Sequence, residues 1–417
     1  MARIFPRSPR RVVVALAATL TVLSVLPALL SSGGSANAQT IGVPSPADDA
    51  FYTPPAPLPA GQPGELIRQR AVDVHAEPLS QVPMPVRAWQ LLYHSTSATG
   101  APNAVSGTLL VPPTPWLGGG DRPLVSYAVG THGLGDDCAP SYKLRTGTEN
   151  EIALISQALF NGWAVVLTDY EGLGTPGEHT YAVGQAEGRA VLDAARAAAR
   201  VDGAGLSTSG PVGLFGYSQG GQATSFAAEL APSYAPELNL VGVATGGVPA
   251  DLDKVARFND GNVGFSLILG AALGYSTAYG DVPFDEILND AGRAVIPRVS
   301  KACTVELATI APLRRLAEFT TVPDVLSDPR WQARLAENRA GTTAPTAPVY
   351  LYHGTLDELI PLPVGQELRA AWCGLGASVQ WQEIPLSEHI MGVSIGGPAA
   401  MLWLGDRFAG KPATSNC

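Results

Sequence analysis

The chain has 417 residues, of which 46% are hydrophobic and 15% are charged. This composition is typical of a packed globular protein and is too apolar for an intrinsically disordered one. The formal net charge is −10 at pH 7. Because nucleic acids and anionic membrane surfaces select basic patches, we expect no nucleic acid partner. The length allows one large domain or two.

The first 38 residues have the features of a secretory signal peptide. Basic residues, including Arg10 and Arg11, precede an apolar run over residues 12–30, and Ala36-Asn37-Ala38 has the pattern of a cleavage site. We therefore expect residues 1–38 to be removed, the mature chain to be secreted, and no integral membrane segment to remain. The alternative is an uncleaved membrane anchor, since the apolar run is nearly long enough to span a bilayer.

Four cysteines remain in the mature chain: Cys138, Cys303, Cys373 and Cys417. An even number of cysteines in an exported protein favours two disulfides over buried free thiols, and three pairings are then open. No C-x-x-C motif is present, so zinc and thioredoxin chemistry are not expected. We predict neither a metal nor a cofactor.

The mature chain begins with a proline-rich segment, which we assign to residues 39–86. Its first part reads as an extended lead-in on the surface, anchored by Phe51 and Tyr52. Two strand-like runs follow, Arg87–His94 and Val105–Val111. The turn-forming residues between them predict an antiparallel hairpin.

Strands and helices then alternate. Continuous apolar runs predict buried strands at 123–129, 163–168, 212–215, 238–244, 347–352 and 379–384. Helical patterns occupy residues 150–160, 185–200 and 222–230. Alternation at this spacing is typical of βαβ units, so we predict an α/β fold with a mostly parallel central sheet.

The alternation is interrupted between residues 251 and 341. Helical runs at Val263–Gly274, Phe284–Val295 and Thr304–Phe319 occur there without an obvious strand. We interpret residues 251–341 as a helical cap, or lid, inserted into one core domain made of residues 87–250 and 342–417. The apolar run Phe265–Leu273 fits an acyl tunnel or lid, and equally a packed core helix.

A G-x-S-x-G motif lies where the strand at 212–215 meets the following helix. Its sequence is Gly216-Tyr217-Ser218-Gln219-Gly220, and strand, sharp turn and helix are the context of a nucleophile elbow. The glycines suit this place because strand and helix approach closely on both sides of a strained serine. Ser218 is therefore the candidate nucleophile.

The order of residues along the chain supplies an acid and a base. Nucleophile elbows are followed by the acid and then by the histidine. Asp357 lies just beyond the strand at 347–352, and His389 is the only histidine after it. We predict Asp357 as the acid, with Glu358 as the alternative, and His389 as the general base. The competing interpretations are a turn-capping carboxylate and an ordinary surface histidine.

Two backbone amides are expected to stabilise an oxyanion. One is that of Gln219, directly after the nucleophile. The other should come from the loop Gly130-Thr131-His132-Gly133, where we choose Thr131, with His132 and Gly133 as neighbours. His132 itself is interpreted mainly as a plain loop histidine. Asp169 and Glu171, at another strand end, are interpreted mainly as side chains that order loops.

In combination, these segments resemble the secretory lipases, the family that includes lipase A of Candida antarctica. The segments that carry the resemblance are Cys138-Ala-Pro-Ser-Tyr142, Asp169-Tyr-Glu-Gly172, Gly216-Tyr-Ser-Gln-Gly-Gly221, Ser233-Tyr-Ala-Pro-Glu-Leu-Asn239, Gly246-Gly247, Asp357-Glu-Leu-Ile-Pro361 and Glu388-His389. The resemblance covers roughly residues 87–417 and implies an α/β-hydrolase fold with a helical cap. It also implies Ser218, Asp357 and His389 as nucleophile, acid and base.

The resemblance further implies disulfides Cys138–Cys303 and Cys373–Cys417. One departure concerns the oxyanion loop, where lipase A of Candida antarctica has an acidic residue and this chain has Gly130-Thr131-His132. Family members hydrolyse triacylglycerols and other long or bulky esters.

The sequence therefore predicts a secreted serine ester hydrolase, first of all a triacylglycerol lipase that forms an acyl-enzyme. We expect a lipid or other ester substrate and transient contact with a lipid interface. The alternatives are a carboxylesterase for short or bulky esters, a secreted peptidase on the same fold, and a non-catalytic surface protein that retains a hydrolase scaffold.

Overall fold

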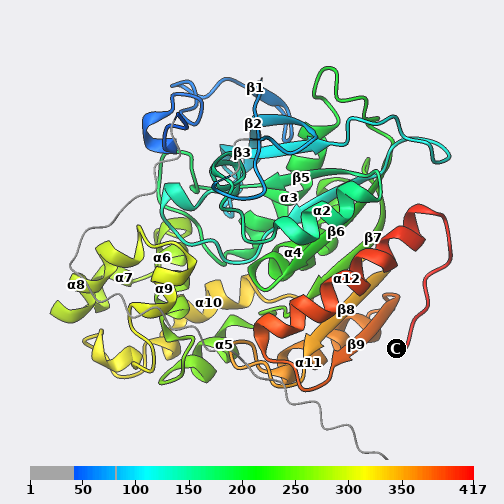
Figure 1. Cartoon of the computed structure of the whole chain (residues 1–417). Helices are drawn as coiled ribbons and strands as arrows, with labels where there is room; N and C mark the ends of the chain where they lie inside the picture. Colours follow the sequence, from blue (N-terminus) through cyan, green and yellow to red (C-terminus); the bar gives the residue numbers. More distant parts are fainter. Residues whose placement is uncertain (1–41, 80–81) are drawn as a thin grey trace, which may run out of the picture. The chain divides into compact units, whose positions relative to one another are not determined.

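A computed structural model describes residues 42–79 and 82–417 (Figure 1). The expected signal peptide, residues 1–38, and the alternative anchor at 12–30 lie outside the described residues. Within the described ranges, no helix combines the length and apolar character that a bilayer span requires.

The core is a nine-stranded sheet with the order β1-β2-β3-β5-β4-β6-β7-β8-β9. Neighbouring strands are antiparallel from β1 to β5 and parallel from β5 through β9. The strands are β1 (Leu66–Ala71), β2 (Arg87–Thr96), β3 (Pro102–Val111), β4 (Leu124–Ala128), β5 (Ala164–Thr168), β6 (Pro211–Tyr217), β7 (Asn239–Gly246), β8 (Val349–Gly354) and β9 (Val379–Ile384). The predicted hairpin and mostly parallel sheet are confirmed.

Helices cover both faces of this sheet, which is why the central strands are buried along their whole length. The geometry of β6 shows this directly, because alternate residues of a strand point to opposite faces. A side chain at Gly213 would collide with Phe408 of α12 (His389–Phe408), whereas one at Gly216 would collide with α4 (Gln219–Tyr234). The helices α12 and α4 therefore pack on opposite faces.

The remaining helices complete two groups. On the α4 face, α3 (Gly184–Ala198) packs along α4, and Trp372 of α11 (Leu362–Gly374) donates a hydrogen bond to Glu229 of α4 at 2.8 Å. On the other face, α2 (Ile152–Phe160) packs against α12. A shorter helix, α1 (Pro140–Thr146), follows the loop after β4.

The segment between β7 and β8 is helical, as predicted, but its helices differ from those expected. They are α5 (Leu252–Asn259), α6 (Phe265–Ala278), α7 (Phe284–Ile287), α8 (Asp290–Val299), α9 (Thr304–Thr309) and α10 (Pro329–Glu337). The helices α5 and α10 were not predicted. The single helix expected over Phe284–Val295 is wrong, because the Asn289 side chain accepts from the Gly292 amide and starts a new helix there.

The helix expected over Thr304–Phe319 is also wrong. The helix α9 ends at Thr309, and Pro312 follows. Proline has no amide to donate and disfavours a helical residue before it, so it opposes continuation of the helix.

The proline-rich lead-in is anchored as predicted, since Phe51 and Tyr52 are buried and the Tyr52 hydroxyl lies 2.9 Å from Ser141 Oγ. Asp49 adds an ion pair with Arg145 at 3.0 Å. The strand β1 was missed in this segment. Its side chains are only half-buried, so it lacks the apolar run of a central strand.

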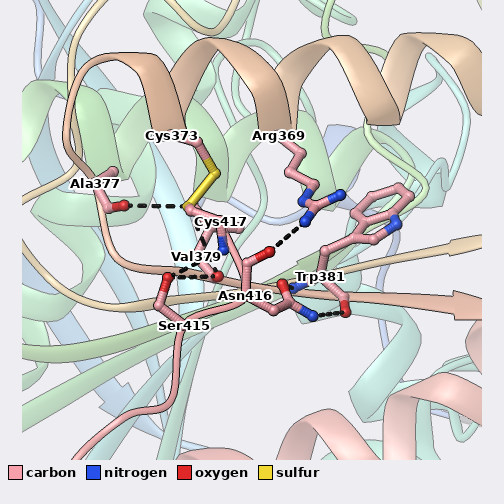
Figure 2. The surroundings of a disulfide bond; sticks show 8 residues. All are labelled: Arg369, Cys373, Ala377, Val379, Trp381, Ser415, Asn416 and Cys417. Atoms are coloured by element: carbon pink, nitrogen blue, oxygen red, sulfur yellow. Dashed lines mark hydrogen bonds between the residues drawn. A yellow bond between two sulfur atoms is a disulfide. The ribbon is translucent and has the colours of Figure 1, made fainter.

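Two disulfides, Cys138–Cys303 and Cys373–Cys417, are present, the pairing that the resemblance implies. The second ties the C-terminal tail beside β9, the last strand of the sheet (Figure 2). The Asn416 amide donates to Val379 O at 3.0 Å, and its side chain accepts from Trp381 N and donates to Trp381 O. The tail thus satisfies backbone groups that an open sheet edge would expose.

The two disulfides are expected to contribute unequally to stability. In the chain-entropy view, a disulfide stabilises more when it closes a longer loop, and the separations are 165 residues for Cys138–Cys303 and 44 for Cys373–Cys417. Replacing Cys138 and Cys303 together by alanine should therefore destabilise the protein by about 1 kcal/mol more than replacing Cys373 and Cys417. Chemical denaturation without reductant measures both values, and an equal or reversed order would contradict this expectation.

Candidate active site

Ser218 occupies a sharp turn between β6 and α4. Its backbone has φ 60° and ψ −121°, a conformation that costs free energy for a residue with a Cβ. A Cβ at Gly216 would lie 2.1 Å from Gly220 O, and a Cβ at Gly220 would lie 2.0 Å from Ala128 O. Both motif glycines are therefore required by close backbone contacts, as the sequence predicts.

The structure brings Ser218, His389 and Asp357 together in one hydrogen-bonded chain. His389 Nε2 lies 2.9 Å from Ser218 Oγ, and His389 Nδ1 lies 2.7 Å from Asp357 Oδ2. The other oxygen of Asp357 accepts from the amides of Leu359 and Ile360 at 3.0 and 2.8 Å. Such a chain can pass the hydroxyl proton to the imidazole while the carboxylate stabilises the imidazolium.

Asp357 is held in its charged form. Burial opposes ionisation, but the hydrogen bond and charge of His389 outweigh it and hold the pKa of Asp357 below its ordinary value. Glu358, the alternative acid, accepts from the backbone amide of His389 at 3.0 Å rather than from its ring. Asp357, and not Glu358, therefore faces the imidazole.

Two further side chains position this arrangement, and sequence reasoning missed both. The Tyr217 hydroxyl donates to His389 O at 2.8 Å. His353 is the last but one residue of β8. Its Nε2 lies 3.4 Å from Asp357 Oδ2 and 2.9 Å from Ile360 O. Burial lowers the pKa of His353, which favours a neutral ring. The sequence offered one signal, the spacing of His353 four residues before Asp357.

The loop after β4 lies beside Ser218. A Cβ at Gly130 would be 4.0 Å from Ser218 Cβ. The Gly130 amide donates to Glu151 Oε1 at 2.6 Å, and the Thr131 hydroxyl pairs with Tyr181 Oη at 2.8 Å. The amide of Thr131 has no acceptor in the part of the chain that the structure describes. The amide of Gln219 is the first of α4 and so has no partner within the helix.

His132 differs from the expected plain loop histidine. It is buried, with Nε2 2.9 Å from Glu149 Oε1 and Nδ1 2.9 Å from Gly130 O. Burial alone would lower its pKa, but the charge and hydrogen bond of Glu149 outweigh burial and raise the pKa of His132 to about 9. A buried ion pair therefore holds the loop from within.

The inserted helical segment also contacts this loop. The Thr304 amide donates to His132 O at 3.0 Å, and the Thr304 hydroxyl donates to Thr131 O at 2.7 Å. Gly133 forms a β-bridge with Cys303, whose disulfide to Cys138 lies next to it. The loop beside Ser218 and the start of α9 are thus one connected unit.

The side chain of Gln219 points to a buried carboxyl group that the sequence did not indicate as functional. Gln219 Nε2 donates to Glu187 Oε1 at 2.8 Å. Burial raises the pKa of Glu187 to about 8. The sequence signal was weak, because Glu187 is one of two acidic residues, with Asp193, in an alanine-rich helix.

A cavity opens beside Ser218. The helices α5 and α6 supply half of its apolar lining residues, and its lining also includes Ser218, Gln219, Gln222 and Asn259. A second, apolar cavity shares Leu252, Ile268 and Ala271 with it. Within the run Phe265–Leu273, Phe265 is buried, as in a packed core helix, and Ile268 lines both cavities.

Asp169 has the loop-ordering role expected of it. It is buried, accepts from the Ser141 amide at 2.8 Å and from Ser106 Oγ at 2.6 Å, and lies outside the cavity lining. Glu171 likewise accepts from Asn103 Nδ2 at 2.6 Å. Within residues 42–79 and 82–417, no group of acidic, histidine or cysteine side chains is arranged to hold a metal ion.

Comparison with known proteins agrees with this architecture. The crystal structure of Candida antarctica lipase A in its closed state superposes with a TM-score of 0.81 at 26% identity, over 89% of this chain and 88% of that one. The fold is therefore that of an α/β-hydrolase. Among curated relatives, Lipase 10 of Candida albicans is 32% identical over 91% of this chain and 85% of its own length.

A mycobacterial relative is also similar. The "Probable inactive lipase MT1628" of Mycobacterium tuberculosis is 35% identical over 89% of this chain and 84% of its own length. The sequence model of the family described as "Secretory lipase" matches residues 140–416. The fold, the extent of this match and the shared identity over most of each relative together establish that the chain belongs to the secretory lipase family.

Proposed function

We propose that the protein is a secreted serine ester hydrolase, and in the first place a triacylglycerol lipase. The observation that carries the proposal is the hydrogen-bonded chain Asp357–His389–Ser218, which ends at an apolar cavity. Family membership supports an ester or lipid substrate. The two disulfides and the signal-like residues 1–38 support an extracellular location.

The proposed reaction proceeds through an acyl-enzyme. Ser218 Oγ attacks the ester carbonyl carbon while His389 Nε2 takes its proton, and Asp357 stabilises the imidazolium. The amides of Gln219 and Thr131 donate to the oxyanion. When the tetrahedral intermediate collapses, the C–O bond to the alcohol breaks and His389 returns the proton to the leaving oxygen. Water, activated by His389, then hydrolyses the acyl-enzyme.

We further propose that residues 251–341 act as the cap that selects the substrate, with 87–250 and 342–417 as the hydrolase core and 39–86 as the lead-in. The helices α5 and α6 belong to this segment and line the cavity beside Ser218. An apolar cavity continued by a second one suits a long acyl chain, which favours a lipase over an esterase for short esters or a peptidase.

The competing function is a non-catalytic protein that keeps the hydrolase scaffold. The mycobacterial relative, which is named a probable inactive lipase, gives this alternative weight. Against it stands the Ser218 hydroxyl within 2.9 Å of a histidine whose other nitrogen faces a carboxylate. Scaffolds retained without catalysis have no need of this arrangement.

Replacing Ser218 by alanine is expected to abolish labelling by a fluorophosphonate probe. Hydrolysis of p-nitrophenyl esters should fall by at least about 10⁴-fold, because the nucleophile is lost. Gel fluorescence and initial rates measure the two effects, with the exposed Ser209→Ala as the matched control. Full activity or labelling in Ser218→Ala would rule out the mechanism, and a parent protein that neither reacts nor hydrolyses would support the non-catalytic alternative.

Activity on esters with acyl chains from C4 to C16 tests the substrate class. The proposed lipase should hydrolyse the long-chain esters and emulsified triacylglycerol, because two apolar cavities that share lining residues lie on the Ser218 side of the inserted helices. Rates are measured with and without an oil–water interface. Activity confined to short, dissolved esters would assign the protein as a carboxylesterase instead.

The buried pair His132–Glu149 should make stability depend on pH. Since the pKa of His132 is raised to about 9, above its unfolded value of about 6.5, the pair stabilises fully below pH 6.5 and less as the pH rises toward 9. Glu149→Gln should therefore lower Tm more at pH 6 than at pH 9.5. Thermal unfolding of parent and variant at both values checks this, and a pH-independent difference would contradict it.

A further inference from the structure

Two residues that line the cavity beside Ser218 carry buried polar side-chain atoms that have no protein partner. Both amide atoms of Gln222, Nε2 and Oε1, and the oxygen Oδ1 of Asn259 lack a hydrogen-bond partner in the described part of the chain. Gln222 is 0% exposed and Asn259 is 2% exposed, and both residues line the cavity. Most of the remaining lining is apolar. Because buried polar groups in proteins are nearly always hydrogen-bonded, these atoms need an explanation.

The orientation of the Asn259 amide is settled by its other contacts. Its Nδ2 donates to Val255 O at 2.9 Å and to Leu359 O at 2.8 Å. Reversing the amide would set its oxygen against two carbonyl oxygens, so the unpartnered atom is an acceptor. Gly264 leaves room for it, since a Cβ there would lie 2.2 Å from Oδ1. Asn259 can therefore receive a hydrogen bond from a ligand.

Gln222 lies one helical turn after Ser218 on α4, and its backbone amide donates to Ser218 O at 2.9 Å. Its side chain brings one donor and one acceptor into the same cavity wall. A ligand group that satisfies Gln222 and Asn259 must both donate and accept. One alcohol hydroxyl can accept from Gln222 Nε2 and donate to one of the two oxygens, whereas a hydrocarbon chain leaves all three atoms unpaired.

From this chemistry we infer that the cavity binds an acyl chain bearing a hydroxyl group, with Gln222 and Asn259 as the residues that select it. The inference rests on the proposed ester hydrolysis and names its substrate class as esters of hydroxylated acids. In the proposed reaction the acyl group stays bonded to Ser218 while the alcohol departs. Because Ser218 and the fully buried Gln222 line the same cavity, we assign this cavity to the acyl part of the ester.

The adjoining cavity continues the pattern. Its lining is apolar except for a few groups, among which Tyr275 Oη and Trp331 Nε1 are buried and also without a partner within the described residues. Trp331 can only donate, and Tyr275 can donate or accept.

The test compares ethyl octanoate with its 2-, 3- and 6-hydroxy derivatives, using the parent protein and Gln222→Met. Methionine keeps the length of the side chain but removes both hydrogen-bonding atoms. The readout is the ratio of kcat/KM for each hydroxy ester to that for ethyl octanoate. In the parent this ratio should exceed one for at least one derivative, and in Gln222→Met it should fall by about tenfold.

A matched control and a folding measurement accompany the test. Gln366→Met changes an exposed glutamine on α11, outside both cavities, and should leave every ratio unchanged. The Tm of Gln222→Met should be at least that of the parent, because the substitution removes unpaired buried polar atoms. A structure of the parent acylated by a hydroxyalkyl phosphonate should place the hydroxyl against Gln222.

The outcomes separate this inference from the proposed function. If ethyl octanoate is hydrolysed but the ratios are the same in the parent and in Gln222→Met, the unpaired atoms bind only water and the inference is wrong while the proposed function stands. If the parent hydrolyses no ester and does not react with a fluorophosphonate, the proposed function fails and the inference fails with it.

Discussion

The turn at Ser218 is the constraint on which the rest of the site depends. A serine with φ 60° and ψ −121° raises the free energy of the chain, and the fold offsets this through contacts that only glycine permits at positions 216 and 220. The Ser218 amide donates to Gly246 O at 3.0 Å, which joins the turn to β7. Held in this way, Ser218 and the first turn of α4, with Gln219 and Gln222, line the same cavity.

The parallel sheet explains why distant residues meet there. In parallel strands the carboxyl ends lie at one edge, so the segments after β4, β6 and β8 bring Thr131, Ser218 and Asp357 to that edge. His389 arrives from the loop after β9, as the first residue of α12, and Glu388 caps that helix by accepting from Met391 N at 2.8 Å. The imidazole is therefore positioned by a helix start rather than by a flexible turn.

The inserted helices contribute to the site in two ways. They form the apolar walls of the cavities, and through Thr304 and the Cys138–Cys303 disulfide they are connected to the loop that carries Thr131. The buried His132–Glu149 pair holds the same loop from the core side.

The sequence by itself determined the strands, the turn motif, and the candidates Ser218, Asp357 and His389, because apolar runs, glycine spacing and chain order are local signals. It missed β1, whose half-buried side chains form no apolar run, and it misjudged two inserted helices that end near the Asn289 cap and Pro312. Only the tertiary structure decided that His132 forms a buried ion pair with Glu149 and that Gln219 donates to Glu187. It also decided that Gln222 and Asn259 line the same cavity. Such contacts join residues far apart in the chain, where burial and partner geometry, rather than residue type, set the chemistry.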